Sequence, residues 1–124
     1  MEIKLINQNN TKIAVIRSDE VIITDAQSAL DLMATLRYES DCNCVAIPKS
    51  AITEDIFVLS TGIAGEIMQK FVNYRFRFAV YGDFSHYTSQ PLLDFIYESN
   101  KGNHIFFVAD ENEALGKLAG MSYE

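Results

Sequence analysis

The sequence predicts an α/β protein built on a mixed sheet of four or five strands, and three observations support this fold class. Short strand-like runs alternate with longer segments whose apolar residues recur at helical spacing. This alternation is typical of parallel strands joined by right-handed crossovers. Two strand-like runs at the start, separated by a polar turn, add an antiparallel hairpin. The 124 residues, 48% of them apolar, are expected to form one domain over residues 1–124.

The hairpin is predicted from the first two runs of the chain. Residues 3–7 alternate apolar and polar side chains, and residues 12–17 are rich in β-branched residues. The polar residues 8–11 between them favour a turn. Residues 21–23 would add a short extended segment.

A first helix is expected next, because Thr24 or Asp25 can cap its start. The stripe of residues that repeats at helical spacing is Ala26, Ala29, Leu30, Met33, Leu36 and Arg37.

Strand and helix then alternate to the end of the chain. Further strands are expected at residues 44–47, 75–81 and 105–108, and residues 53–58 form a connection with a short helical turn. Helices are expected from about residue 62 to 73, from the Ser89 cap to about residue 100, and after the Asp110 cap. The third helix would present a broad apolar face made of Leu92, Leu93, Phe95, Ile96 and Tyr97.

Charge and cysteine content limit the possible partners. The formal net charge is −7, and binding of nucleic acid needs a basic surface, so no nucleic-acid partner is expected. Cys42 and Cys44 are too few for a disulfide framework and have no second metal-binding pair, so neither a metal nor another cofactor is predicted. The sequence shows no signal-peptide pattern and no membrane-spanning run. We therefore expect a cytoplasmic protein without membrane attachment.

The most distinctive motif lies ahead of the second helix, at residues 59–67. Ser60, Thr61 and Gly62 would stand at a helix N-terminus, where free backbone N–H groups and the helix dipole favour an anion. One interpretation is a helix cap, with Gly65 allowing the helix to approach the sheet closely. The other is a phosphoacceptor or anion-binding site that includes Lys49.

Further polar residues follow the predicted parallel strands. Lys49 and Ser50 come after one strand, and Asp83, Ser85 and His86 come after the next. Ligands of open α/β sheets gather at the carboxyl ends of strands, so these residues could share one rim with Thr61. A Ser–His–Asp triad is not expected, because Asp83, Ser85 and His86 are too close in sequence to converge and no Gly-x-Ser-x-Gly turn is present.

The loop at residues 82–89 also carries aromatic residues. Phe84 and Tyr87 lie in this loop, where exposed aromatic rings would suit a protein interface. The segment Asp83, Phe84, Ser85, His86 and Tyr87 is therefore a candidate interaction loop. A homodimer that buries the antiparallel edge strand or a helix face is a further possibility.

Three long strings of residues resemble a bacterial family catalogued as domain of unknown function 4180. They are TGIAGEIMQKF at residues 61–71, YGDFS at residues 81–85 and DFIYESNKG at residues 94–102. The resemblance implies family membership and covers most of the chain, but it implies no reaction, because this family has no assigned activity.

The order of elements is also similar to that of STAS domains, the fold of anti-sigma-factor antagonists. That family carries Asp-Ser-[Ser/Thr]-Gly-[Leu/Ile]-Gly at the start of its second main helix, with a phosphorylated serine or threonine. Here Ser60 matches the phosphoacceptor and Thr61 the next hydroxyl, whereas Leu59 replaces the aspartate and Ala64 the last glycine. The resemblance implies a STAS-like fold with a regulatory site at this helix start.

These observations together predict a non-enzymatic regulatory or protein-interaction module with a protein partner. Phosphorylation at the start of the second main helix would switch it. The alternative is a small anionic-ligand binder, or a weak enzyme, that uses the rim at the carboxyl ends of the parallel strands.

Overall fold

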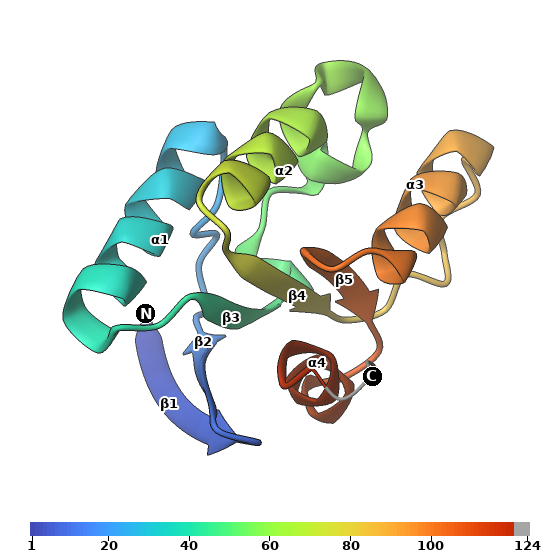
Figure 1. Ribbon diagram of the computed structural model, residues 1–124. Helices are drawn as coiled ribbons and strands as arrows, with labels where there is room; N and C mark the ends of the chain where they lie inside the picture. The colour runs from blue at the N-terminus through green and yellow to red at the C-terminus, as the bar shows by residue number, and fades with distance from the viewer. Residues whose placement is uncertain (121–124) are drawn as a thin grey trace.

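The strands lie side by side in the same order in which they follow one another along the chain. The computed structural model describes residues 1–120. Its five strands form one sheet in the order β1-β2-β3-β4-β5 (Figure 1). The strands are β1 (Glu2–Gln8), β2 (Thr11–Arg17), β3 (Cys44–Pro48), β4 (Arg77–Tyr81) and β5 (Ile105–Val108). β1 is antiparallel to β2, and the remaining neighbours are parallel, which confirms the mixed α/β sheet.

In the described part of the chain, four helices cover the two faces of this sheet. They are α1 (Ala26–Ser40), α2 (Ile63–Asn73), α3 (Gln90–Lys101) and α4 (Glu111–Leu118). Because each right-handed crossover steps to the next strand in the same direction, α1, α2 and α3 lie on one face, and α4 covers the other (Figure 1). Both faces of β2 to β5 are therefore buried, and each face has its own apolar cluster. Short 3-10 turns connect β3 to α2, at Lys49–Ala51, Glu54–Phe57 and Leu59–Thr61.

The predicted helix caps are confirmed. The Asp25 side chain, rather than that of Thr24, caps α1 by accepting a hydrogen bond from Ser28 N at 2.9 Å. Ser89 caps α3, and Asp110 caps α4 by accepting from Glu113 N at 2.9 Å. Hydrogen bonds from Ser28 hold the pKa of Asp25 below its ordinary value.

The structure corrects the predicted burial of two helices. The stripe predicted for α1 omitted Leu32, which is buried together with Ala29, Met33 and Leu36. In α3, Leu93 and Tyr97 are 37% and 61% exposed, so the broad apolar face was wrong. α3 packs over β5 at the border of the sheet, where only a narrow stripe of the helix can be covered.

The fourth strand begins later than predicted. Arg75 has a φ of 55°, a left-handed conformation that no strand residue adopts, so the chain enters β4 only at Arg77. Phe76 is still fully buried, next to the ring of Phe71.

Both cysteines are buried and free. Burial, partly offset by the charge of Arg77, raises the pKa of the Cys44 thiol to about 11. Within residues 1–120, no cluster of three or more His, Cys, Asp or Glu side chains is arranged to hold a metal ion. In the same residues no helix has the length and apolar character needed to cross a bilayer.

Candidate functional site

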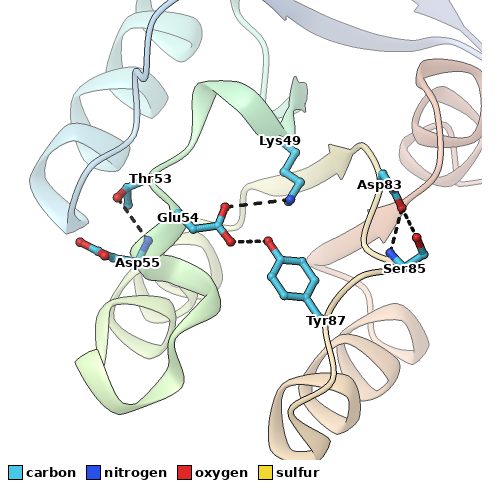
Figure 2. Close-up of polar contacts among 7 residues, drawn as sticks. All are labelled: Lys49, Thr53, Glu54, Asp55, Asp83, Ser85 and Tyr87. Atoms are coloured by element: carbon cyan, nitrogen blue, oxygen red, sulfur yellow. Dashed lines mark hydrogen bonds and ion pairs between the residues drawn. The ribbon is translucent and has the colours of Figure 1, made fainter.

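Three residues form an ion-pair and hydrogen-bond group at the carboxyl end of the sheet. The Tyr87 hydroxyl donates to the Glu54 carboxylate at 2.6 Å, and Lys49 Nζ lies 4.0 Å from the other Glu54 oxygen (Figure 2). Lys49 Nζ also lies 4.8 Å from the centre of the Tyr87 ring. Only 19% of the Lys49 side chain is exposed. The charge of Lys49 is therefore already balanced by a carboxylate and an aromatic face.

Gly82 makes room for Lys49 at the ends of the neighbouring strands β3 and β4. A Cβ atom built on Gly82 would lie 2.7 Å from Lys49 Cβ, which is closer than two such atoms can approach. Lys49 Cβ is fixed to the backbone and cannot move aside as a flexible side-chain end would. The φ of Gly82 is not in the left-handed region, so backbone conformation does not require a glycine here. Close packing against Lys49 does.

Asp83 and Ser85 form a closed turn beside this group. The backbone N–H and the hydroxyl of Ser85 both donate to one Asp83 oxygen, at 2.9 and 2.6 Å (Figure 2). These bonds lower the pKa of Asp83, with smaller contributions from the charges of His86 and Lys49. The His86 ring packs against the Tyr87 ring at 4.2 Å between centroids. Because Ser85 donates to Asp83 and His86 stacks on Tyr87, the three residues are not arranged as a nucleophile, base and orienting acid.

Four of the residues predicted to share a rim, Lys49, Ser50, Asp83 and His86, line one shallow depression of about 650 Å³. Ser85, which was predicted with them, lines a different depression beside Phe84. The lining of the first depression also includes Glu54, so one lysine faces two carboxylates and the surface does not favour an anion. The strand order has no reversal, so the sheet lacks the switch point at which open α/β sheets form ligand crevices. Ser60, Thr61 and Gly62 do not line this depression, so the single rim that included Thr61 was wrong.

The aromatic residues of the loop at residues 82–89 are not free on the surface. Phe84 and Tyr87 are half-buried and pack against the ring of Phe57, at 5.7 and 5.2 Å between centroids. Phe84 also contacts Phe107 of β5 edge to face. The expectation of exposed aromatic rings was therefore wrong, because these rings close the end of the main core.

Two residues at this end of the sheet, Glu54 and the packing residue Phe57, were not predicted from the sequence as parts of a site. The signal was present as an acid directly after Thr53, which caps the turn, and an apolar pair at residues 56–57. Their partner Tyr87 lies 33 residues away from Glu54, so only the tertiary structure identifies the contact.

The turn before α2 separates the two candidate hydroxyls. We call residues 59–65 the α2 N-terminal turn. The Thr61 hydroxyl lies within hydrogen-bond distance of two carbonyl oxygens, those of Asp55 at 3.1 Å and Val58 at 2.9 Å, and accepts from Ile63 N at 3.2 Å. The Ser60 side chain is exposed, and within residues 1–120 its hydroxyl forms no hydrogen bond. Thr61 therefore holds the turn and accepts from the first N–H of α2, although the N-cap itself is Gly62 and not a hydroxyl residue. The Ser60 hydroxyl is free to contact a partner or to be modified.

Two glycines give the α2 N-terminal turn a bare surface. Gly62 is the N-cap residue directly before α2 and has a φ of 78°, which an L side chain rarely adopts. Gly65 is exposed, and a Cβ built on either glycine would meet nothing within 4 Å. The prediction that Gly65 allows close helix–sheet packing was wrong, because this glycine faces outward.

Tyr87→Phe should reduce the loss of stability at alkaline pH. Burial, followed by the hydrogen bond to Glu54 and its charge, raises the pKa of Tyr87 above its ordinary value. The neutral hydroxyl therefore stabilises the fold fully below about pH 10, the pKa of an unfolded tyrosine, and this contribution is lost as the pH rises toward the folded-state pKa. Thermal melts across this range should show a shallower decline of the melting temperature for the variant. Tyr97→Phe, which changes an exposed tyrosine, should keep the wild-type slope, and parallel curves for Tyr87→Phe and wild type would contradict the role of Tyr87.

Fold and site together define an α/β protein whose sheet is wound in one direction, with a mixed-charge depression at its carboxyl end. The chain belongs to the family described as Domain of unknown function (DUF4180), whose model matches residues 8–118. This finding confirms the family resemblance drawn from residues 61–71, 81–85 and 94–102. No curated protein and no solved structure gives a match to the chain.

Proposed function

We propose that the protein is a non-enzymatic regulatory module, STAS-like in fold, that binds a protein partner over the α2 N-terminal turn. Support for the fold comes from the initial hairpin and the sequential parallel strands, an element order similar to that of STAS domains. We place the protein in the bacterial cytoplasm, a reducing compartment in which two free cysteines persist.

The observation that carries this proposal is the surface formed by Ser60, Gly62 and Gly65. A free hydroxyl stands beside two glycines that have open space above them. A glycine within a helix costs about 0.5–1 kcal/mol relative to alanine, and no contact inside the described residues explains Gly65. Approach of a partner's backbone to the bare helix surface accounts for the missing side chain.

A phosphoryl group on Ser60 would act mainly on the partner. It adds nearly two negative charges at pH 7, close to the N-terminus of α2, whose dipole tolerates an anion. The neighbouring acids Asp55 and Glu66 give this surface a negative charge already. The bulk and charge of the phosphoryl group would block a partner that packs closely over Ser60 and remove any hydrogen bond that the Ser60 hydroxyl donates to it, without refolding the domain. Phosphorylation of Thr61 would instead break the contacts that hold the turn.

The first test is the intact mass of the protein isolated gently from its native host. A phosphoryl increment that maps to Ser60, with Thr61 unmodified, supports the switch. If the chain is unmodified and Ser60→Asp recovers the same partners as the wild type, the switch is refuted. A bound small molecule lost on Lys49→Ala would favour the ligand-binding alternative instead.

A matched pair of glycine substitutions tests the docking surface separately from the switch. Gly65 of α2 and Gly116 of α4 both lie within a helix, and a Cβ atom added to either would have nothing within 4 Å. Gly65→Gln and Gly116→Gln should each leave stability unchanged or raise it by up to about 1 kcal/mol, because glutamine favours helix. Only Gly65→Gln should reduce recovery of the partner in affinity purification. Equal recovery with both variants would refute docking over the α2 N-terminal turn.

A further inference from the structure

The two edges of the sheet differ: a side chain satisfies backbone groups of β5 at one edge, whereas β1 at the other edge is open. At the β5 edge, the side chain of Asn100 from α3 takes the place of a neighbouring strand. Its amide donates to Phe107 O at 3.0 Å, and its carbonyl oxygen accepts from Phe107 N at 2.7 Å. At the other edge, β1 pairs with β2, and within residues 1–120 no strand or helix lies beyond it (Figure 1). An unpaired edge of seven residues is a template for another strand.

The open edge carries apolar side chains on one face and charges on the other. Met1 and Leu5 are 66% and 48% exposed, and Ile3 between them is half-buried. Side chains alternate along a strand, so these three residues share one face, whereas Glu2 and Lys4 point to the opposite face. Leaving this apolar stripe in water costs free energy that a second strand with the same pattern would recover.

The hairpin turn determines which backbone groups of β1 face outward. Asn9 and Asn10 have φ values of 53° and 62°, which define a two-residue turn of the type preferred in hairpins. The pair that closes such a turn, Gln8 and Thr11, exchanges hydrogen bonds, and every second pair along the strands does the same. The N–H and C=O groups of Ile3 and Leu5 therefore point away from β2. A further antiparallel strand must place its own outward-facing residues opposite these two.

Few symmetric arrangements meet this condition, and one of them matches every side chain that it pairs, which are those of residues 1–5. With Ile3 opposite Ile3 of a second copy, Met1 lies opposite Leu5, and Glu2 lies opposite Lys4 twice. Shifting the centre to Lys4 places two lysines opposite each other, which is destabilising. Shifting it to Leu5 places Ile3 opposite the polar Asn7.

We propose that the protein forms a two-fold homodimer by antiparallel pairing of β1 with β1 of a second copy, centred on Ile3. The two sheets join into one continuous sheet across the dimer axis. The paired segments, residues 1–5 of each copy, bury less surface than a standard protein–protein interface. The dimer should therefore dissociate on dilution. This surface lies on β1 and is separate from the α2 N-terminal turn. A result that refutes the dimer therefore leaves the regulatory proposal untouched, and the reverse is also true.

Charge reversal tests the pairing in the full-length protein. Sedimentation velocity over a dilution series at low salt should show a monomer–dimer equilibrium for the wild type. Glu2→Lys and Lys4→Glu should each weaken self-association by about tenfold or more, because each removes two ion pairs and creates two repulsions. An equimolar mixture of the two variants should regain the dimer, since the lysine-bearing edge then meets the glutamate-bearing edge. The mixture also controls for folding, because Glu2→Lys places a lysine opposite Arg17 of β2.

Disulfide trapping tests the register. Under mild oxidation Ile3→Cys should give a covalent dimer, because the two Cα atoms face each other within disulfide reach. Leu5→Cys should not, because its two copies are about 14 Å apart in this register. The native thiols of Cys42 and Cys44 are buried and do not compete. The proposal is overturned by a wild-type protein that stays monomeric, by a dimer insensitive to both charge reversals, or by trapping through Leu5→Cys instead of Ile3→Cys.

Discussion

Phe71→Ala is expected to lower the free energy of unfolding by about 3–5 kcal/mol, the range observed when a large buried aromatic side chain is truncated. Phe71 of α2 is fully buried where the helix meets the sheet. Its ring stacks on Phe78 at 4.4 Å between centroids and lies 6.0 Å from the ring of Phe76. Removing the Phe71 ring leaves a cavity against Phe78 of β4 and Phe76 just before it, and this cavity cannot collapse unless the strand moves.

Urea denaturation of the variant and the wild type measures this loss. Val72→Ala is the matched control, because Val72 is the next residue on the same helix and is 45% exposed. Its cost should stay within about 0.5 kcal/mol. A loss below about 1 kcal/mol for Phe71→Ala would mean that α2 is not anchored by this ring.

Arg77→Met is expected to lower the free energy of unfolding by about 3 kcal/mol and to loosen α4 selectively. The guanidinium of Arg77 on β4 donates to the carbonyls of Leu118 at 2.8 Å and Lys117 at 3.0 Å, which belong to the last turn of α4. It also donates to Asn103 O at 3.1 Å. The last carbonyls of a helix have no partner one turn further along the helix, so the variant removes the hydrogen bond that Leu118 O receives from Arg77, and also the one to Asn103 O. Lys117 O keeps the backbone N–H of Gly120 at 3.2 Å.

Hydrogen exchange followed by mass spectrometry separates this role from general destabilisation. Amides of α4 should exchange faster in Arg77→Met than those of α1, which Arg77 does not contact. Arg77→Lys should recover only part of the stability, because one ammonium group cannot reproduce the planar fork that reaches three carbonyls. Arg75→Met, the same change at an exposed position two residues earlier, should have little effect. Unchanged α4 exchange in Arg77→Met would exclude the proposed anchor.

The candidate site was only partly predictable from the sequence. At the α2 N-terminal turn, the position of the residues could be predicted but their hydrogen bonds could not. The sequence pattern placed Ser60, Thr61 and Gly62 at the start of a helix, because hydroxyl residues and glycine there have local causes. It could not decide between the two hydroxyls. That decision depends on the Asp55 carbonyl, which the 3-10 turn at Glu54–Phe57 brings to Thr61 at 3.1 Å.

The rim residues show the same limit over longer distances. Lys49 and Asp83 were expected at the carboxyl ends of neighbouring strands, which follows from parallel topology alone. The neutralisation of Lys49 by Glu54 and the burial of Phe84 against Phe57 depend on how distant segments pack. The interpretation of Lys49 as an anion ligand and of Phe84 as an exposed contact therefore changed once those neighbours were known.

The sequence by itself determined the order and type of elements, the capping residues Ser89 and Asp110, and the buried strands, because each depends on residues close together in the chain. For the first helix it narrowed the cap to Thr24 or Asp25, and the structure decided for Asp25. Only the tertiary structure decided which face of α3 is covered, which hydroxyl is free and which sheet edge is open. These depend on contacts between residues such as Glu54 and Tyr87, 33 positions apart, and Asn100 and Phe107 on neighbouring elements. A periodic pattern reports that a side chain is buried, but the identity of its neighbour is decided by how the elements pack against one another.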